Sequence, residues 1–427
     1  MKIGVRIKGG ALQFVLFIGV LIAILLLTFI TLGYTHTFFG KKTDALVSTI
    51  KKSELGLEYL LKKDIPYNDT IILDLGINDG IDVKAVKEFW GIYHKYTVIS
   101  NFRKNRFAKL ALIGGKVGEQ LPSLYVKDNE RPMIIVGNSK ITGDAFLPKQ
   151  GIRPGNISGN SYYNNTLIYG RQLESTSQLP ELDQNIKVQI ADVLNASFLG
   201  PNESIVDITN KKYLSTSFGL PTNYIYGEQI NLAGVELIGN IIIKATRKIV
   251  VNASSKLQDV ILVAPEIVIE DHVTGTFQAI ASERIVVGEQ CALSYPSALV
   301  VYDTKESFFG NNQDGLQKPN IDIGSNTFIS GVVQYLGESE TPKFHPQIKI
   351  EKGAKIIGEV YCEQNLELKG QVVGSVTTNN FIAMENGSVY QNHLFNGTIN
   401  SDLLPKQYVG INYEDSNTTK AVSKWLY

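Results

Sequence analysis

The chain has 427 residues, enough for two or three domains. Its 41 basic and 41 acidic residues cancel, so no net field draws it toward nucleic acid, and we expect no nucleic-acid partner. Hydrophobic residues make up 44% of the chain, which is ample for a core.

The N-terminus reads as a membrane anchor. Residues 11–32 are nearly uninterrupted apolar positions, and such a stretch meets the length of about 20 residues needed to cross a bilayer. It is too long for a typical signal-peptide core, and no small-residue cleavage site follows it. Because Lys2, Arg6 and Lys8 precede it without an acidic residue, the positive-inside tendency leaves the N-terminus in the cytoplasm. We therefore predict a transmembrane helix at 11–33 in contact with lipid.

The helical pattern continues beyond the apolar stretch. From Ala11 to about Lys63 the chain reads as one long helix that is first apolar and then amphipathic, with Leu46, Ile50, Leu57, Leu60 and Leu61 on one side. Residues 34–65 are therefore expected to form a helical stalk.

A family resemblance starts in the leader. The leader MKIGVRIKGG ends in Gly9-Gly10 and runs directly into the apolar segment at Ala11. This is similar to the class III leader of type IV pilins and type II secretion pseudopilins, which a prepilin peptidase cuts after glycine. The resemblance implies cleavage between Gly10 and Ala11, and a long helix followed by an antiparallel sheet. The family usually has glutamate at the fifth mature position and an aromatic residue or Met at the first, where this chain has Val15 and Ala11.

The same resemblance implies a location and partners. It implies a single-pass protein of the bacterial inner membrane, with its bulk outside the cytoplasm or, in a filament, outside the cell. Partners would then be other pilin-like or envelope subunits. A plain single-pass anchor with a helical stalk remains the alternative.

The sequence pattern predicts a small α+β domain over residues 66–132. Strands are expected at 70–75 and 109–114, with aromatic-rich strands or a hairpin over 86–100. The run Asn78-Asp79-Gly80-Ile81-Asp82 has carboxylates that could bind calcium, but it lacks the EF-hand spacing, and a turn is the preferred interpretation. Arg103, Lys104, Arg106 and Lys109 could contact anionic lipid or glycan, or form a basic hairpin edge.

An 18-residue repeat dominates the second half. Ile249-Val250-Val251 recurs as Ile267-Val268-Ile269 and Ile285-Val286-Val287, each 18 positions on, with a six-residue period inside. Alternate residues of a strand share one side, so each hexad aims two residues inward. No charged residue occupies these positions over nine hexads, which are Ile249/Val251, Ser255/Leu257, Ile261/Val263, Ile267/Ile269, Val273/Gly275, Ala279/Ala281, Ile285/Val287, Cys291/Leu293 and Ser297/Leu299. The pattern predicts a three-faced parallel β-helix with about 18 residues per coil.

The repeat also sets domain boundaries. The pattern resumes after interruptions at 303–320 and 336–346, which we predict to be loops inserted into a regular β-helix over 231–402. Residues 133–230 are expected to form irregular early coils and a cap. Residues 403–427 are expected to form a C-terminal cap that folds back over the last coil or along one face, with Trp425 buried. The register turns Cys291 and Cys362 inward about two coils apart, so both are expected to be buried free thiols without a disulfide.

No catalytic site emerges from the sequence. Glu270-Asp271-His272 is the one acid–base cluster of the regular coils, and it reads as a solvated turn. Glycine-cornered coils around Gly331, Gly358 and Gly374 resemble bactofilin-like scaffolds. The predicted fold is thus mainly β: a transmembrane helix and stalk, a small α+β (pilin-like) domain, then the β-helix. We expect a non-enzymatic, membrane-anchored structural or assembly protein without cofactor or metal. The alternative is a carbohydrate-binding or carbohydrate-active β-helix of the cell envelope.

Overall fold

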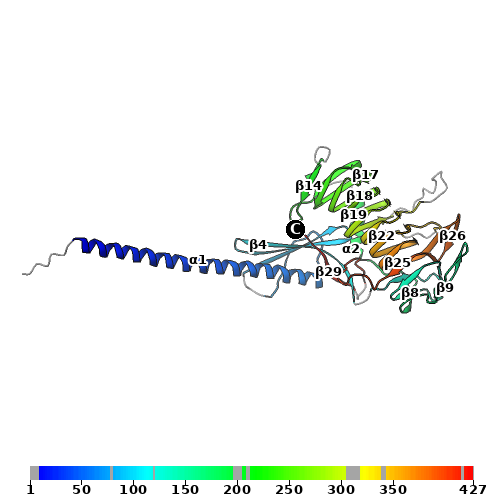
Figure 1. Cartoon of the computed structure of the whole chain (residues 1–427), viewed down its shortest axis with the longest axis horizontal. Helices are drawn as coiled ribbons and strands as arrows, with labels where there is room; N and C mark the ends of the chain where they lie inside the picture. The colour runs from blue at the N-terminus through cyan, green and yellow to red at the C-terminus, as the bar shows by residue number, and fades with distance from the viewer. Residues whose placement is uncertain are drawn as a thin grey trace, which may run out of the picture. The chain divides into compact units, whose positions relative to one another are not determined.

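The chain is mainly β, with one long apolar helix at its N-terminus (Figure 1). The computed structural model describes residues 9–76, 80–118, 121–195, 204–207, 212–303, 318–337, 343–414 and 418–426. The chain divides into two compact units. The first holds residues 1–59, 70–85 and 98–109, and the second holds residues 60–69, 86–97 and 110–427.

The N-terminal helix α1 (Gly9–Lys62) is a single uninterrupted element. It is long and apolar enough to cross a membrane, and the apolar window is fully exposed. Its most exposed large side chains include Phe14, Leu27 and Ile30. The prediction of one long helix is therefore confirmed, with its end at Lys62. The leader residues 1–8 lie outside the described part of the chain.

The second half of α1 packs on antiparallel strands within the first unit. These strands are β1 (Ile71–Ile72) and the adjoining parts of β2 (Asp82–Trp90), β3 (Tyr93–Phe102) and β4 (Asn105–Val117). Gly56 of α1 faces Val83 and Val98, and a Cβ at Gly56 would meet Val98 Cγ1 at 2.8 Å. Helix and sheet are thus in close contact. The strand predicted at 70–75 is shorter than expected, whereas the aromatic hairpin is present as β2 and β3.

In the second unit, the C-terminal strand β29 (Thr418–Leu426) pairs antiparallel with β4, from Thr418 opposite Val117 to Leu426 opposite Leu110. The sheet order is β1-β2-β3-β4-β29. The sequence analysis expects residues 403–427 to fold back over the last coil or along one face, with Trp425 buried. Ile411 and Leu426 of the tail do join a buried cluster with other segments of the second unit. The predicted burial of Trp425 is wrong, since β29 extends this sheet and Trp425 is 40% exposed.

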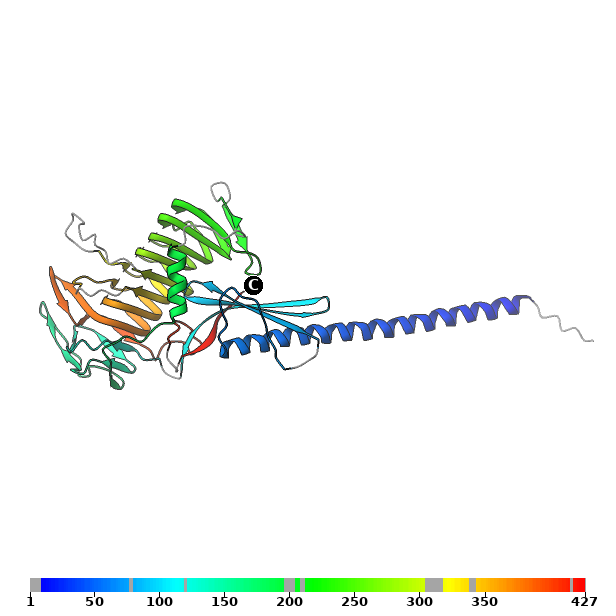
Figure 2. The same ribbon diagram turned by 180° about the vertical axis from the view of Figure 1, so that it is seen from behind.

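Strands of the second unit form one closed, barrel-like sheet, in which the pairings are parallel except that β26 runs antiparallel to β25. Its long strands run through residues 223–385 and are drawn side by side in Figure 2. The members are β5 (Leu124–Val126), β7 (Lys140–Thr142), β8 (Ala145–Leu147), β12 (Gln172–Glu174), β13 (Ser204–Ile205), β14 (Tyr213–Thr216), β15 (Asn223–Leu232), β16 (Glu236–Gly239), β17 (Ile241–Val251), β18 (Lys256–Ile269), β19 (Thr274–Val287), β20 (Ala292–Tyr302), β21 (Ile321–Ile323), β22 (Phe328–Leu336), β23 (Ile348–Ile350), β24 (Lys355–Leu368), β25 (Gln371–Glu385), β26 (Ser388–Gln391) and β28 (Thr398–Asn400).

Smaller elements complete the unit. Three parallel strands pair in the order β27 (His393–Phe395), β6 (Met133–Val136) and β9 (Ile152–Pro154). A short hairpin joins β10 (Asn156–Ile157) and β11 (Asn160–Ser161). Helix α2 (Gln184–Asn195) lies against β18 and β19.

Strand pairing follows the 18-residue repeat. Ile249 pairs with Ile267, and Ile267 with Ile285. The same column continues through Ile321, Ile348 and Leu366. A second column aligns Leu257, Gly275, Leu293, Ile329, Ile356, Val372 and Ile399, and a third aligns Leu262, Ala279, Leu299, Val333, Val360 and Val376. Except for the half-buried Gly275, these side chains are buried in one cluster.

One predicted pair is off by a residue. The sequence analysis turns Ile261 and Val263 inward, but Leu262 and Ala264 occupy this position in the inner cluster. Ile261 and Val263 point to the opposite side and join a second cluster. The cause is a bulge between Gln258 and Val260, where Asp259 has a φ of 59°. The extra residue flips every following side chain of the strand until the next irregularity.

Residues 133–230 do not form one run of early coils. Strand β7 pairs with β28, placing Ile141 beside Ile399, and β8 and β12 extend the same ladder through β5, which precedes this stretch and pairs with β25. Strands β14 and β15 pair instead with β16 and β17 at the other end. The two halves of this stretch therefore extend opposite ends of the strand ladder. Composition could not reveal this, because the pairing joins segments that are far apart in the chain, as for Ile141 and Ile399.

Of the predicted insertions, residues 304–317 and 338–342 lie outside the described part of the chain. In the described remainder, Leu336 is the last residue of β22 and is buried, whereas residues 343–346 belong to no strand. Cys291 and Cys362 are both buried in the inner cluster and are not disulfide-bonded.

Candidate functional site

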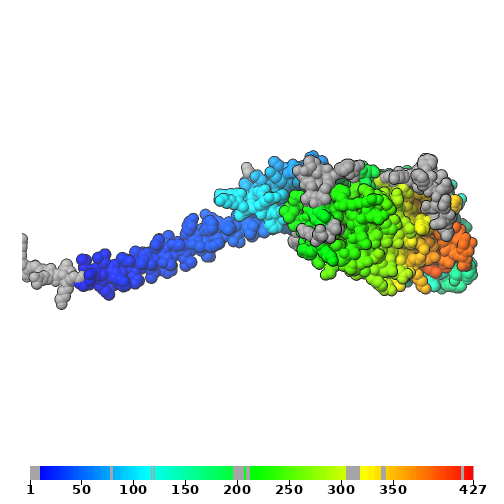
Figure 3. Space-filling view, turned by 90° about the horizontal axis from the view of Figure 1, so that it is seen from above, coloured from blue at the N-terminus to red at the C-terminus, as the bar shows by residue number. Residues whose placement is uncertain are grey.

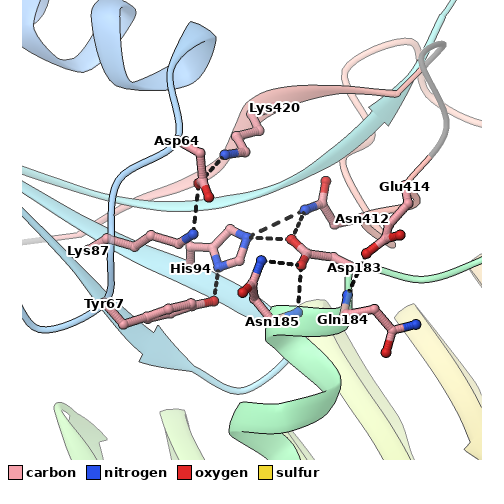
Figure 4. Close-up of polar contacts among 10 residues, drawn as sticks. All are labelled: Asp64, Tyr67, Lys87, His94, Asp183, Gln184, Asn185, Asn412, Glu414 and Lys420. Atoms are coloured by element: carbon pink, nitrogen blue, oxygen red, sulfur yellow. Dashed lines mark hydrogen bonds and ion pairs between the residues drawn. The ribbon is translucent and has the colours of Figure 1, made fainter.

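The only histidine with both ring nitrogens in polar contacts, among the described residues, is His94 of β3 (Figure 4). It is fully buried. The Tyr67 hydroxyl lies 2.6 Å from His94 Nδ1, and Asp183 Oδ2 lies 3.5 Å from Nε2. Asn412 donates from Nδ2 to Asp183 Oδ2 at 2.7 Å and lies 3.4 Å from His94 Nε2. Four distant segments of the second unit thus meet at one imidazole.

Asp183 holds its place because it caps helix α2. Its Oδ1 accepts a hydrogen bond from the Asn185 backbone N–H at 2.9 Å, as an N-cap carboxylate does. The Gln184 backbone N–H donates to Glu414 Oε1 at 3.0 Å, so a second carboxylate serves the same helix end. Negative charge at this end also complements the helix dipole. The site therefore fixes where α2 begins.

A second carboxylate, Asp64, extends the network. Lys87 Nζ donates to Asp64 Oδ1 at 2.8 Å, and Lys420 Nζ donates to the same oxygen at 2.6 Å. Lys87 is buried and its Nζ lies 4.3 Å from the centre of the Tyr67 ring. Burial raises the pKa of Asp64, but the two lysines outweigh burial and hold this pKa below its usual value. These contacts tie the segment after α1 to β2 and to β29.

Electrostatics decide the protonation of His94. Burial lowers the pKa of His94, against the opposing effect of Asp183, so the imidazole is neutral at neutral pH. Burial also raises the pKa of Tyr67, which stays protonated and donates to Nδ1. Nε2–H then faces Asp183. Burial would raise the pKa of Asp183, but the hydrogen bonds from His94 and Asn185 lower it, so this carboxyl is ionised.

Tyr67, His94 and Asp183 place a hydroxyl, an imidazole and a carboxylate in one chain of polar contacts. Catalytic triads combine a nucleophile, a base and an acid in the same way. The Tyr67 hydroxyl is not activated here, because burial raises its pKa. The nearest cavity has about 10 Å³, room for at most one water. It is bordered by Ile92, Asp183, Ile186, Gln334, Ile411 and Asn412. The geometry suits a structural tie better than chemistry on a substrate.

A second polar anchor lies on β24. Glu359 is 2% exposed and accepts hydrogen bonds from the Ile411 backbone N–H at 3.0 Å and the Tyr413 hydroxyl at 3.2 Å. Burial raises the pKa of Glu359 to about 7, although the donors from the tail oppose it. This carboxyl thus holds residues 411–413 of the tail against the outward side of β24.

The sites singled out in the sequence behave differently. Glu270 accepts from Asn252 Nδ2 and Asp271 Oδ1 accepts from the Glu289 backbone N–H, so these carboxylates brace successive turns. His272 is exposed with a φ of 62°. Asn78 and Asp79 lie outside the described residues. Arg103 and Lys104 form the turn between β3 and β4, and Lys109 pairs with Glu54 at 2.9 Å. Within the described residues no group of three or more His, Cys, Asp or Glu side chains could hold a metal.

Sequence reasoning missed His94, Asp183 and Glu359. A signal existed for Asp183, because Asp183-Gln184-Asn185 precedes Ile186 and Ile190 at helical spacing, the usual start of an amphipathic helix. His94 and Glu359 occupy ordinary strand positions, and only tertiary contacts distinguish them.

Comparison of the chain with protein-family models, with curated proteins and with solved structures found no match.

Proposed function

We propose that this protein is a membrane-anchored extracytoplasmic structural or assembly protein, with a pilin-like N-terminal part that displays a three-faced parallel β-helix. The observation that carries the proposal is the two-part character of α1. Its first half is apolar and exposed, and its second half packs on an antiparallel sheet in the same unit. A long helix packed in this way is the arrangement that the leader resemblance implies.

The strand ladder supports the β-helix. Three columns of paired residues share one buried cluster, and corner glycines recur where the resemblance to bactofilin-like coils expects them. Gly331, Gly358 and Gly374 all have φ between 142° and 145°, and a Cβ on Gly358 would lie 1.9 Å from Gly331 O. Only glycine fits such a stacked corner. A scaffold of this kind displays surfaces without needing a reaction.

The role we propose is non-enzymatic, without cofactor or metal. It is supported by the way in which the acid–base groups of the described residues are used. His94 and Glu359 are buried, and both hold chain segments together. An inner-membrane location with an extracytoplasmic bulk, and pilin-like or envelope subunits as partners, belong to the same proposal.

The decisive experiment is the mature N-terminus. The full chain should be expressed with and without a prepilin peptidase, and the membrane-bound product analysed by intact mass and N-terminal sequencing. The proposal expects a peptidase-dependent loss of residues 1–10, and a Gly10→Leu variant that stays uncut. A chain that keeps its leader in both strains contradicts the pilin-like assignment and leaves a plain anchor with a stalk.

Carbohydrate binding is the second candidate. It is favoured by exposed tyrosines on the segment after β11. Tyr163 is 74% exposed, and Tyr169 is 43% exposed with Lys140 Nζ 4.9 Å from the centre of its ring. Such amphipathic rings can contact a sugar with their apolar faces and hydrogen-bond through their hydroxyls. Titration of the protein with envelope polysaccharides, compared with a Tyr163→Ala/Tyr169→Ala variant, tests it. Binding that both proteins share equally would contradict a role for these residues.

A further inference from the structure

The basic hairpin turn between β3 and β4 lies beside α1 within the first unit (Figure 3). Arg103, Lys104 and Arg106 are exposed. No ion pair involves these three side chains among the described residues, whereas Lys109 pairs with Glu54 of α1. Arg103 Cζ lies 5.3 Å from the centre of the Phe102 ring, a contact that leaves its charge uncompensated. The tip therefore carries three exposed cations.

The ion pair between Lys109 and Glu54 sets the level of the tip along the helix. From Lys109 to Lys104, five residues of strand cover about 17 Å. The hairpin runs along α1 toward its N-terminus in Figures 1 and 2. The same length of helix is about 11 residues, so the tip lies level with about residue 43. Lys41 and Lys42 of α1 are exposed at this level.

The helix itself marks where the bilayer ends. The apolar run stops at Leu32, and the exposed aromatic residues Tyr34, Phe38 and Phe39 follow it. Aromatic side chains are typical of the membrane–water interface. Lys42 stands ten residues beyond Leu32, about 15 Å along the axis, and the headgroup layer covers about half of that height. The remaining gap is about one Debye length, and an ordinary helix tilt reduces it further.

We propose that Lys41, Lys42, Arg103, Lys104 and Arg106 form a juxtamembrane basic collar that contacts anionic phospholipid headgroups. In sequence, the nearest exposed acidic residues of the same unit are Asp44 for the helix part of the collar and Asp82 for the sheet part. Two carboxylates do not balance five basic side chains, so the net charge of the collar stays positive. Long basic side chains reach toward the headgroups and fix the tilt of α1 relative to the membrane. The inference rests on the proposed insertion of α1.

The test uses the full chain in nanodiscs. A fluorophore is attached at Asn105→Cys, which is selective because Cys291 and Cys362 are buried. Quenching by a nitroxide on the lipid headgroup reports how close the tip is to the bilayer. We expect quenching to rise about twofold when phosphatidylglycerol is added to phosphatidylcholine, and to return to the neutral-lipid value at high salt.

Two variants distinguish a specific effect of the collar from a general effect of the protein's positive charge. Arg103→Gln/Lys104→Gln/Arg106→Gln should lose the lipid-dependent rise. The control Lys149→Gln/Arg153→Gln/Lys352→Gln removes three exposed cations of the second unit and should keep it. Quenching that ignores lipid charge, or falls equally in both variants, overturns the collar. If the chain can be extracted from the discs by carbonate, the anchor itself is wrong and the collar falls with it.

Discussion

The long strands of the parallel sheet bury two different surfaces. On the inner side, Ile243, Leu262 and Leu299 pack on residues of neighbouring strands at the spacing of the repeat. On the outer side, Ile242, Ile261 and Val300 pack beneath Trp90, Ile190 and Ile411, which come from distant segments of the same unit. The sequence repeat therefore determines which residues are buried on the inner side, whereas individual contacts with distant segments determine which are buried on the outer side. Two polar side chains, Gln278 and Glu359, secure the outer cover.

The inner side should be the less tolerant of charge. Ile267→Asp places a carboxylate in the fully buried column, where no partner is available, and should lower the free energy of unfolding by more than about 4 kcal/mol. Chemical denaturation measures the change. The matched control is Val268→Asp, one residue along, which points outward and is half-buried. Equal losses in both variants would contradict the register.

The raised pKa of Glu359 predicts the direction in which stability changes with pH. Its folded pKa of about 7 exceeds the usual value of 4.5, so the folded state binds more protons between these pH values. Stability should therefore fall as pH rises from 4.5 through 7. Glu359→Gln mimics the protonated side chain and removes this loss. At pH 8 the variant should be more stable than the parent by about 3 kcal/mol, with no difference near pH 4.

His94 acts in the opposite direction. Its folded pKa is lowered, so the unfolded state binds more protons and stability falls as pH drops below about 6.5. With Glu359 replaced, stability should therefore rise with pH over this range. Denaturation at several pH values gives both profiles. Glu174→Gln, which removes an exposed carboxylate of β12, should reproduce the parent profile. A Glu359→Gln profile that coincides with the parent at all pH values would contradict the raised pKa.

Gln278 is one of the polar side chains that attach distant segments to the outer side of the sheet. Its Oε1 accepts from the Ile92 backbone N–H and its Nε2 donates to the Trp90 carbonyl, both at 2.9 Å. Gln278→Ala leaves two buried backbone groups unpaired and should cost about 2 to 3 kcal/mol. Gln258→Ala changes an exposed amide on the neighbouring strand and should cost little. The comparison fails if both variants melt alike.

This difference between the two sides explains what the sequence could predict. The column through Ile249, Ile267 and Ile285 was predictable because each of these residues pairs with the residue one repeat further along the chain. The pair Ile261/Val263 was predicted one residue out of place, since a bulge at Asp259 leaves no mark in the hydrophobic pattern. The bulge is compensated by Lys424, which donates to Asp259 at 2.6 Å from a strand 165 residues away. No local pattern contains that contact.

The candidate site obeys the same rule. The cap residue Asp183 and the apolar face of helix α2 can be recognised in the sequence. The partners of Asp183, which are His94 and Asn412, come from segments that are distant in the chain. Trp425 was expected to be buried because a large aromatic residue near a terminus usually covers something. Strand pairing with β4 instead buries Leu426 and turns Trp425 outward, since alternate residues face opposite sides.

The cap of α2 should be a smaller contribution than the buried groups above. Asp183→Ala removes the N-cap acceptor and the partner of Asn412, and should cost about 1 to 2 kcal/mol. Asp192→Ala, an exposed position within the same helix, should change stability by less than about 0.5 kcal/mol. Thermal melting monitored by circular dichroism compares the two. If Asp183→Ala is as mild as Asp192→Ala, the network is not needed to hold α2.

The smallest effect is expected at Trp425, and it separates the two sides of β29. Trp425 is 40% exposed, so Trp425→Ala removes a partly solvated side chain without leaving a closed cavity and should cost about 1 kcal/mol. Leu426 is 5% exposed within the outer cluster, and Leu426→Ala should cost about 2 to 3 kcal/mol because it leaves a cavity there. Truncation of the smaller side chain, Leu426, would then reduce the free energy of unfolding more than truncation of its larger neighbour, Trp425. Denaturant midpoints of the two variants decide the order, and a costlier Trp425→Ala would mean that the tail packs with the opposite face inward.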